Sequence, residues 1–247
     1  MTPEEIVARL LYRDGLMLVV DKPAGFAVHK GPKGGESLED YFDALRFGLP
    51  RAPALAHRLD RDTSGCLVLG RHRKALAELG RLFKSGRVGK TYWALVEGGP
   101  AEDVGRIDLP LGRKDATRGW WMKHDPKGQP ATTTWTVLGR IQSQASSGAV
   151  PDVSWLALEP LTGRTHQLRV HCAAMGWPIV GDSVYGGAPR VGGPALHLHA
   201  REIVVPLYKN RAPIRVSAPV PPHIHERLRA CGWAGDTAAA IDEEHSV

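Results

Sequence analysis

Short apolar runs and one stretch of helical periodicity alternate along the first hundred residues. Residues 16–20, 66–70 and 92–96 are nearly continuous apolar runs, which is typical of buried strands. Between the second and third runs, the apolar residues of 72–85 recur at helical spacing, and Gly86 follows as a candidate C-cap. The pattern predicts the order strand, strand, helix, strand.

The middle of the chain is richer in glycine, proline and charge, which predicts short strands joined by turns. Residues 107–111 and 120–122 are expected to form short strands or hairpin arms. Residues 132–138 and 153–158 carry β-branched or continuous apolar side chains and predict two longer strands, which flank a polar loop at 142–151.

The last third of the chain predicts one further helix and several short strands. The helix is expected at residues 165–175, where Gly176 ends the pattern, and strands follow as far as Val216. The end of the chain is small and acidic, which predicts a disordered tail at 234–247. A chain of 247 residues that is 43% hydrophobic then fits one domain at 1–233.

Composition bears on the cellular compartment of this domain and on the state of its cysteines. The chain has no apolar run long enough for a membrane span and no basic-then-apolar start, so we expect a cytoplasmic protein. Cys66, Cys172 and Cys231 are an odd number of cysteines at wide separations. They predict reduced thiols, with neither a disulfide framework nor a zinc site.

The net charge of +6 is concentrated in one segment. Between Arg51 and Lys90 the chain carries ten lysines and arginines against three acids. Such a stretch suits a nucleic-acid partner, because neutralised phosphates supply most of the affinity. The alternative is a solvated cationic helix face.

The segment from His57 to Gly65, with the sequence His-Arg-Leu-Asp-Arg-Asp-Thr-Ser-Gly, places two carboxylates among three bases. Neighbouring cations lower the pKa of a carboxylate, so Asp60 or Asp62 could be a permanently ionised nucleophile or base. A salt-bridged surface turn explains the same residues equally well.

A second dense cluster runs from Leu161 to His171 and contains two arginines and two histidines. On a helix Thr165 would suit the N-cap, and His166 and Arg169 would share a face. A guanidinium is the natural partner of a carboxylate that must stay ionised, although a cationic helix start facing phosphate or solvent is the alternative.

Several classes of site are disfavoured. No Gly-x-Ser-x-Gly elbow surrounds Ser64 and the chain has no P-loop, which argues against serine hydrolases and nucleoside-triphosphate enzymes. His166 and His171 lack the spacing and the glutamate of a zinc-protease helix. Four other histidines form pairs that could bind a metal but are more simply explained as solvent-facing or satisfied: His197, His199, His223 and His225. We expect no metal.

Five motifs in order over residues 16–215 resemble those of the RluA-type RNA pseudouridine synthases. They are Asp21-Lys22-Pro23-x-Gly25, the segment 57–65, Lys90-x-Tyr92-x-Ala94-Leu95-Val96, the segment 163–171 and Gly176-x-Pro178-Ile179-x-Gly181-Asp182-x-x-Tyr185-Gly186. The resemblance implies an α+β fold built on a mixed, largely antiparallel sheet with flanking helices. It also implies an enzyme that detaches a uracil from its ribose, turns it and rejoins it through carbon, without a cofactor.

The resemblance assigns roles to matching residues. Asp60 would be the catalytic carboxylate, attacking the ribose anomeric carbon or removing the neighbouring 2′ proton, and Arg169 would pair with it. Tyr92 would stack on the uracil and transfer a proton, Leu168 would line the base pocket, and Arg58 would help displace the base from the RNA. The remaining motif residues are expected to bind substrate (His57, Arg61, Arg164, His166, Gln167) or to form a structural turn (Thr63, Ser64, Gly65).

We expect a monomer that acts on a tRNA or ribosomal RNA hairpin. Several relatives carry an N-terminal S4-type RNA-binding module, but here the first motif begins within about twenty residues of Met1. Target choice is therefore expected to depend on insertions at 98–130 and 140–152.

Two other functions fit parts of the pattern. A non-catalytic RNA-binding or folding factor could use the same basic surface. A glycoside hydrolase could use Asp60 and Asp62 as its acid and base, but adjacent arginines disfavour the raised pKa that a general acid needs.

Overall fold

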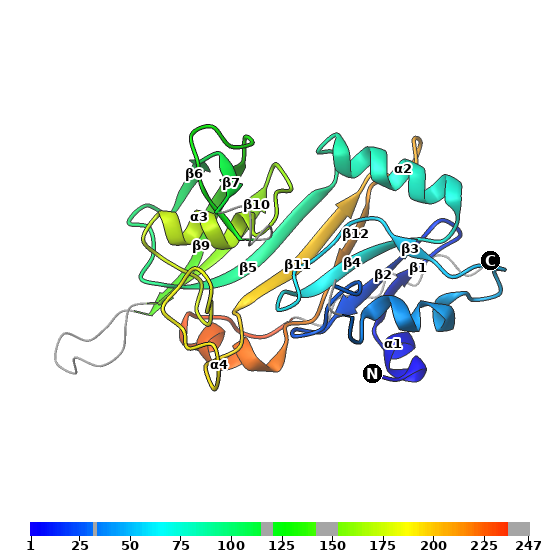
Figure 1. Cartoon of the computed structure of the whole chain (residues 1–247), viewed down its shortest axis with the longest axis horizontal. Helices are drawn as coiled ribbons and strands as arrows, with labels where there is room; N and C mark the ends of the chain where they lie inside the picture. Colours follow the sequence, from blue (N-terminus) through cyan, green and yellow to red (C-terminus); the bar gives the residue numbers. More distant parts are fainter. Residues whose placement is uncertain (32–33, 115–120, 142–152, 237–247) are drawn as a thin grey trace.

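A ten-stranded sheet forms the centre of the molecule (Figure 1). The structure is a computed structural model and describes residues 1–31, 34–114, 121–141 and 153–236. In sheet order the main strands are β1 (Leu10–Arg13), β2 (Met17–Lys22), β4 (Ser64–Gly70), β11 (Leu198–Val205), β5 (Gly89–Glu97), β10 (Val153–Pro160), β9 (Thr132–Ile141) and β6 (Val104–Asp108). Among the described strand pairs, β4 with β11 is parallel and the rest are antiparallel.

Shorter strands and, in the described residues, five helices complete the fold. β3 (Ala54–Leu55) pairs with β4, β12 (Ile214–Ser217) pairs with β11, and β7 (Leu111–Arg113) and β8 (Met122–His124) form a separate hairpin. The helices are α1 (Pro3–Ala8), the 3₁₀ helix η1 (Leu38–Leu45), α2 (Arg73–Lys84), α3 (Gln167–Ala174) and α4 (Pro222–Ala230). This arrangement confirms the predicted α+β fold with a mixed, largely antiparallel sheet and flanking helices.

The sheet is covered on both faces, which explains why its strands read as continuous apolar runs. In β2, Met17 and Val19 pack in a cluster with α2, whereas Leu18 and Val20 pack with α1 and η1. In β5, Ala94 and Val96 pack with α3, whereas Leu95 packs with α4. In Figure 1, α2 and α3 lie above the sheet and α1 and α4 lie below it.

The predicted elements of the first half are confirmed. The runs at 16–20, 66–70 and 92–96 lie in or against β2, β4 and β5, and the helix at 72–85 is α2. Gly86 has a φ of 68°, the left-handed conformation expected of a C-cap. The helices α1, η1 and α4 were not predicted. Each is short, and α4 buries only Ile224 and Leu228, which is too few for a periodic signal.

Two predicted boundaries are wrong. The strand expected at 107–111 is divided between β6 and β7, because Pro110 has no N–H to continue a ladder. The helix expected at 165–175 begins only at Gln167, because the preceding residue, His166, has a left-handed backbone conformation. The strands expected at 132–138 and 153–158 lie inside β9 and β10, while Trp120 and the loop at 142–151 fall outside the described residues.

Asp236, the last described residue, lies within the predicted tail at 234–247 and contacts the domain. Asp236 Oδ2 accepts a hydrogen bond from the Val220 N–H at 3.1 Å, and Asp236 Oδ1 lies 2.7 Å from Nη2 of Arg201. Asp236 is therefore held against the domain, and residues 237–247 of the predicted tail lie outside the described part of the chain.

Candidate active site

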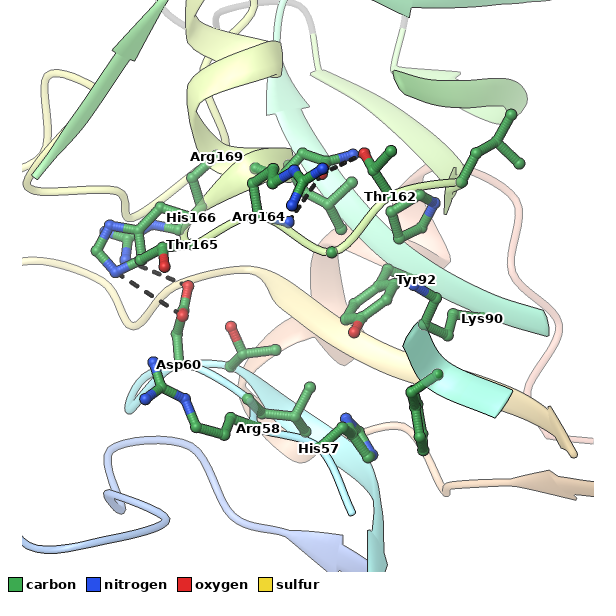
Figure 2. A pocket seen from close by; sticks show the side chains of 18 of the residues that line it. His57, Arg58, Asp60, Lys90, Tyr92, Thr162, Arg164, Thr165, His166 and Arg169 are labelled. Carbon is green, nitrogen blue, oxygen red and sulfur yellow. Dashed lines mark hydrogen bonds and ion pairs between the residues drawn. The ribbon is translucent and has the colours of Figure 1, made fainter. Parts of the chain in front are cut away.

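A cavity of about 640 Å³ opens between the C-terminal end of α2 and the loop that leads into α3 (Figure 2). This volume is within the usual range for a small-molecule or nucleotide site. Its wall combines the two charged segments of the sequence, 57–60 and 161–169, with Lys90 and Tyr92 of β5. Of the described residues that line it, Asp60 is the one acid, against five lysines and arginines: Arg58, Lys84, Lys90, Arg164 and Arg169.

Asp60 lies in a turn that is held in place by hydrogen bonds to buried groups. The Thr63 N–H donates to the Asp60 carbonyl oxygen at 3.2 Å and closes the turn. The Lys22 ammonium, fully buried, donates to the carbonyl oxygen of Arg61 at 2.8 Å and to those of Pro23 and Phe26 at 2.7 Å. Burial lowers the pKa of Lys22 to about 7, although nearby aspartates oppose this shift. Lys22 therefore joins the first motif to the second, a role that sequence analysis did not assign.

Arg169 has a different principal partner from the one expected. Its Nε and Nη2 donate to the Asp182 carboxylate at 2.7 and 2.8 Å, while its Nη1 lies 3.8 Å from Asp60 Oδ2. Burial would raise the pKa of Asp182, but the hydrogen bonds from Arg169 hold it below its usual range. Arg169 is thus fixed by Asp182 and presents its remaining nitrogen to Asp60. Asp182 belongs to the last of the five sequence motifs. Membership of that motif was the one sequence feature that pointed to Asp182 as a site residue.

His166, which was expected to bind substrate, is the second side chain that lies close to Asp60. Its Nε2 lies 3.8 Å from Asp60 Oδ1, and Figure 2 shows both contacts of Asp60 as dashed lines. Burial lowers the pKa of His166, although Asp60 opposes this, so the ring is neutral near pH 7. His166 has a left-handed φ of 52° at the N-cap position of α3, which is why the helix begins two residues later than expected, with His166 in place of Thr165 at its start.

Tyr185 fixes the orientation of the His166 ring. The Tyr185 hydroxyl oxygen accepts from the Met122 N–H at 3.0 Å and lies 2.8 Å from His166 Nδ1. Because its oxygen accepts from Met122, its own proton is available to Nδ1. In the tautomer in which Nδ1 accepts from the Tyr185 hydroxyl, the proton of neutral His166 is on Nε2, on the side of Asp60. Tyr185 belongs to the last of the five motifs, and its sequence position alone does not indicate this role.

Tyr92 and Leu168 supply an apolar surface opposite these polar groups. The Tyr92 side chain lines the cavity, and burial together with Asp60 raises the pKa of its phenol. The hydroxyl is therefore protonated near pH 7. Leu168 is buried and packs in the same hydrophobic cluster as Tyr92. A flat ring face beside a leucine suits an aromatic base.

Three of the predicted substrate-binding residues are engaged mainly by the protein itself. His57 Nε2 accepts from the Val68 N–H at 3.0 Å, and burial lowers the pKa of His57 to about 3, so it is a neutral wall of the cavity. Gln167 is buried, and its amide makes four hydrogen bonds, two of them to Thr132 and Thr133.

Arg61 is the third. It is absent from the described lining of the cavity, and its Nε donates to the Gly25 carbonyl oxygen at 2.9 Å. Arg58 and Arg164 lie at the exposed rim, where Arg164 Nε also donates to the Pro130 carbonyl oxygen at 3.1 Å. Of the three basic residues in the segment 57–65, His57 and Arg58 line the described cavity and Arg61 does not.

The predicted structural turn at Thr63, Ser64 and Gly65 is mostly strand. Ser64 and Gly65 begin β4, and the Ser64 hydroxyl lies 2.9 Å from His199 Nδ1 in the core. Gly65 has a φ of 103°, and a Cβ there would lie 2.3 Å from the Ala200 carbonyl oxygen. The close approach of β4 to β11 requires glycine at this position.

In the described part of the chain, no three histidine, cysteine or acidic side chains gather in a way that could hold a metal ion. None of its helices is long and apolar enough to cross a membrane. Cys66, Cys172 and Cys231 are free and buried.

Comparison with known proteins gives a consistent result. Residues 16–174 match the sequence profile of the RNA pseudouridylate synthase family. An uncharacterised RNA pseudouridine synthase from Zymomonas mobilis is 41% identical over 218 residues, which cover 87% of this chain and 95% of the relative. The ribosomal large subunit pseudouridine synthase C of Vibrio cholerae is 32% identical, over 89% of this chain and 68% of that protein. The solved structure of human RNA pseudouridylate synthase domain containing 1 is 32% identical, with a TM-score of 0.69, over 85% of this chain and 82% of that chain.

Proposed function

The chain belongs to the RNA pseudouridylate synthase family, and we propose that Asp60 is the group through which it converts a uridine of RNA to pseudouridine. The observation that carries the proposal is the position of Asp60. It is the one acid among the described residues of the cavity wall, and it faces Arg169 and His166 at 3.8 Å. Its side chain is 27% exposed, so a substrate can reach it.

Both chemical routes require a carboxylate in this position. A carboxylate can attack the anomeric carbon of the ribose and release the uracil, or it can remove the 2′ proton to start the same cleavage. Arg169, which Asp182 holds in place, and His166 both lie 3.8 Å from the Asp60 carboxylate and keep it directed into the cavity. The geometry supports either route, because each places the ribose beside the same carboxylate.

Tyr92 and Leu168 suit the uracil. A uridine inside a folded RNA must leave the base stack to reach Asp60, and stacking on Tyr92 can recover on the order of 1 to 3 kcal/mol of the lost energy. The protonated Tyr92 hydroxyl can exchange a proton with the detached ring. Arg58, at the exposed rim, is placed to contact the RNA from which the base departs.

The substrate we favour is a hairpin of ribosomal RNA or tRNA, modified in the cytoplasm by a single copy of the protein. The excess of basic residues around the cavity supports an RNA partner. The name of the Vibrio cholerae relative, a ribosomal large subunit enzyme, favours ribosomal RNA of the two.

The test compares Asp60→Asn with Asp62→Asn as a matched control, because Asp62 is exposed and lies outside the described cavity lining. Each protein is given RNA from cells that lack this protein, and pseudouridine is mapped and quantified. Asp60→Asn is expected to lose at least about a thousandfold in rate, while Asp62→Asn retains most of its activity. Equal activity of Asp60→Asn and wild type would refute the assignment. Binding without any isomerised uridine by wild type would instead favour the RNA-binding factor.

A further inference from the structure

The cavity continues beyond Tyr92, on the side away from Asp60. Figure 2 shows Lys90 next to Tyr92 and further from Asp60 in this view. We call this side of the cavity the Lys90 compartment; Phe83, Lys84 and Leu161 line the same cavity as Lys90. None of these side chains has a role in the uridine chemistry described above.

Lys90 is a half-buried cation whose charge the protein does not balance. Within the described ranges its ammonium has neither a hydrogen bond nor an ion pair, and burial lowers its pKa. Removing a charge from water without a partner costs free energy, so such a group is retained where a ligand completes it. An anionic ligand in the cavity would balance the charge of Lys90.

The neighbours of Lys90 strengthen this requirement. Lys84 adds a second positive charge to the same wall, and His57, which stacks on Phe83 with ring centroids 4.5 Å apart, is neutral near pH 7. Leu161, which lines the same cavity, is 53% exposed and adds an apolar surface to it. The compartment thus pairs positive charge with a surface for a sugar or base.

We propose that the Lys90 compartment is a phosphodiester subsite, in which Lys90 binds an RNA phosphate that flanks the target uridine and Leu161 contacts the adjacent nucleotide. The proposal rests on the proposed function, because the phosphate is assigned to Lys90 on the assumption that the target uracil stacks on Tyr92. Lys90 and Tyr92 are two positions apart on β5, about 7 Å along the strand and on one face of it. A single nucleotide can therefore contact both side chains.

The experiment measures binding of a labelled oligocytidylate that contains one uridine, with Asp60→Asn as the background so that no turnover occurs. In two further RNAs, the phosphodiester on the 5′ or the 3′ side of the uridine is replaced by a neutral methylphosphonate. Lys90→Gln is the test variant, Lys90→Arg restores the charge, and Lys74→Gln, on the exposed face of α2 outside the described cavity lining, is the control.

One of the two neutral linkages is expected to weaken binding about fivefold in the background protein and in Lys74→Gln, but not in Lys90→Gln. Lys90→Gln should also reduce the slope of log affinity against log salt by about 0.7, as the loss of one phosphate contact to a single strand predicts. Lys90→Arg should recover both effects. Urea unfolding of each variant shows that the fold is intact.

The subsite proposal would be overturned if the neutral linkages reduced the binding affinity equally in the background protein and in Lys90→Gln. It would also be overturned if Lys90→Gln left the slope of log affinity against log salt unchanged. Failure of the background protein to bind the oligonucleotide would do so as well. Pseudouridine formation by wild type is measured separately. An active wild type without this coupling refutes only the subsite, whereas coupling in a protein that makes no pseudouridine refutes only the proposed function.

Discussion

Lys22 holds the turn that carries Asp60, although it never reaches the cavity. Its ammonium is fully buried and donates to the carbonyl oxygens of Pro23, Phe26 and Arg61. Lys22→Met keeps most of the side-chain volume but leaves three acceptors without a donor. Each buried unsatisfied acceptor costs about 1 to 3 kcal/mol, so we expect the free energy of unfolding to fall by about 3 kcal/mol or more in urea denaturation.

The control is Lys74→Met, an exposed position of α2, which should change the free energy of unfolding by less than about 0.5 kcal/mol. A Lys22→Met protein as stable as wild type would show that water or relaxed backbone satisfies these carbonyl groups.

At the scale of elements, Tyr185 connects the β7–β8 hairpin to the start of α3. Its hydroxyl contacts the Met122 N–H of β8 and Nδ1 of His166, so loss of the hydroxyl removes both contacts at once. Tyr185→Phe should reduce kcat about tenfold, because His166 is no longer oriented toward Asp60. The free energy of unfolding should change by less than about 1.5 kcal/mol.

Tyr208→Phe is the matched control. It also loses one phenol hydrogen bond, to Asp14, in a region outside the described cavity lining. Similar kcat values for Tyr185→Phe and Tyr208→Phe would remove Tyr185 from the positioning of His166.

At the scale of the whole molecule, neutral buried histidines should make the fold sensitive to acid. Burial lowers the pKa of His57 to about 3 and those of His197 and His199 to about 4. Below pH 6.5 the unfolded chain binds protons at these sites that the folded protein does not, so stability is lost as the pH falls from about 6.5 toward 4. Asp21, whose pKa burial raises to about 6, opposes the loss but is a single group.

Near pH 5.5 unfolding should take up at least about two protons, a slope of roughly 3 kcal/mol per pH unit. Urea denaturation at a series of pH values measures this slope. His197→Asn should lower it by about one proton. A flat profile between about pH 4 and 6.5 would mean that these histidines are protonated in the folded protein.

Local pattern determined much of this protein. The runs at 16–20 and 66–70 and the helical spacing of 72–85 predicted β2, β4 and α2, because side-chain periodicity and glycine sterics act over a few residues. The order of the motifs likewise identified the family and singled out Asp60. Side-chain periodicity did not predict α4, because this helix buries few side chains. It also did not predict that β6 and β7 are separate strands.

Only the tertiary structure decided which charged groups meet. The bases around Asp60 in sequence turn away from it or lose their charge, as Arg61 and His57 do, while Arg169 and His166 reach it from the start of α3. Asp182, rather than Asp60, is the principal partner of Arg169. The physical reason is that Coulomb interaction and desolvation depend on distance through space and on burial, and neither quantity is set by separation along the chain.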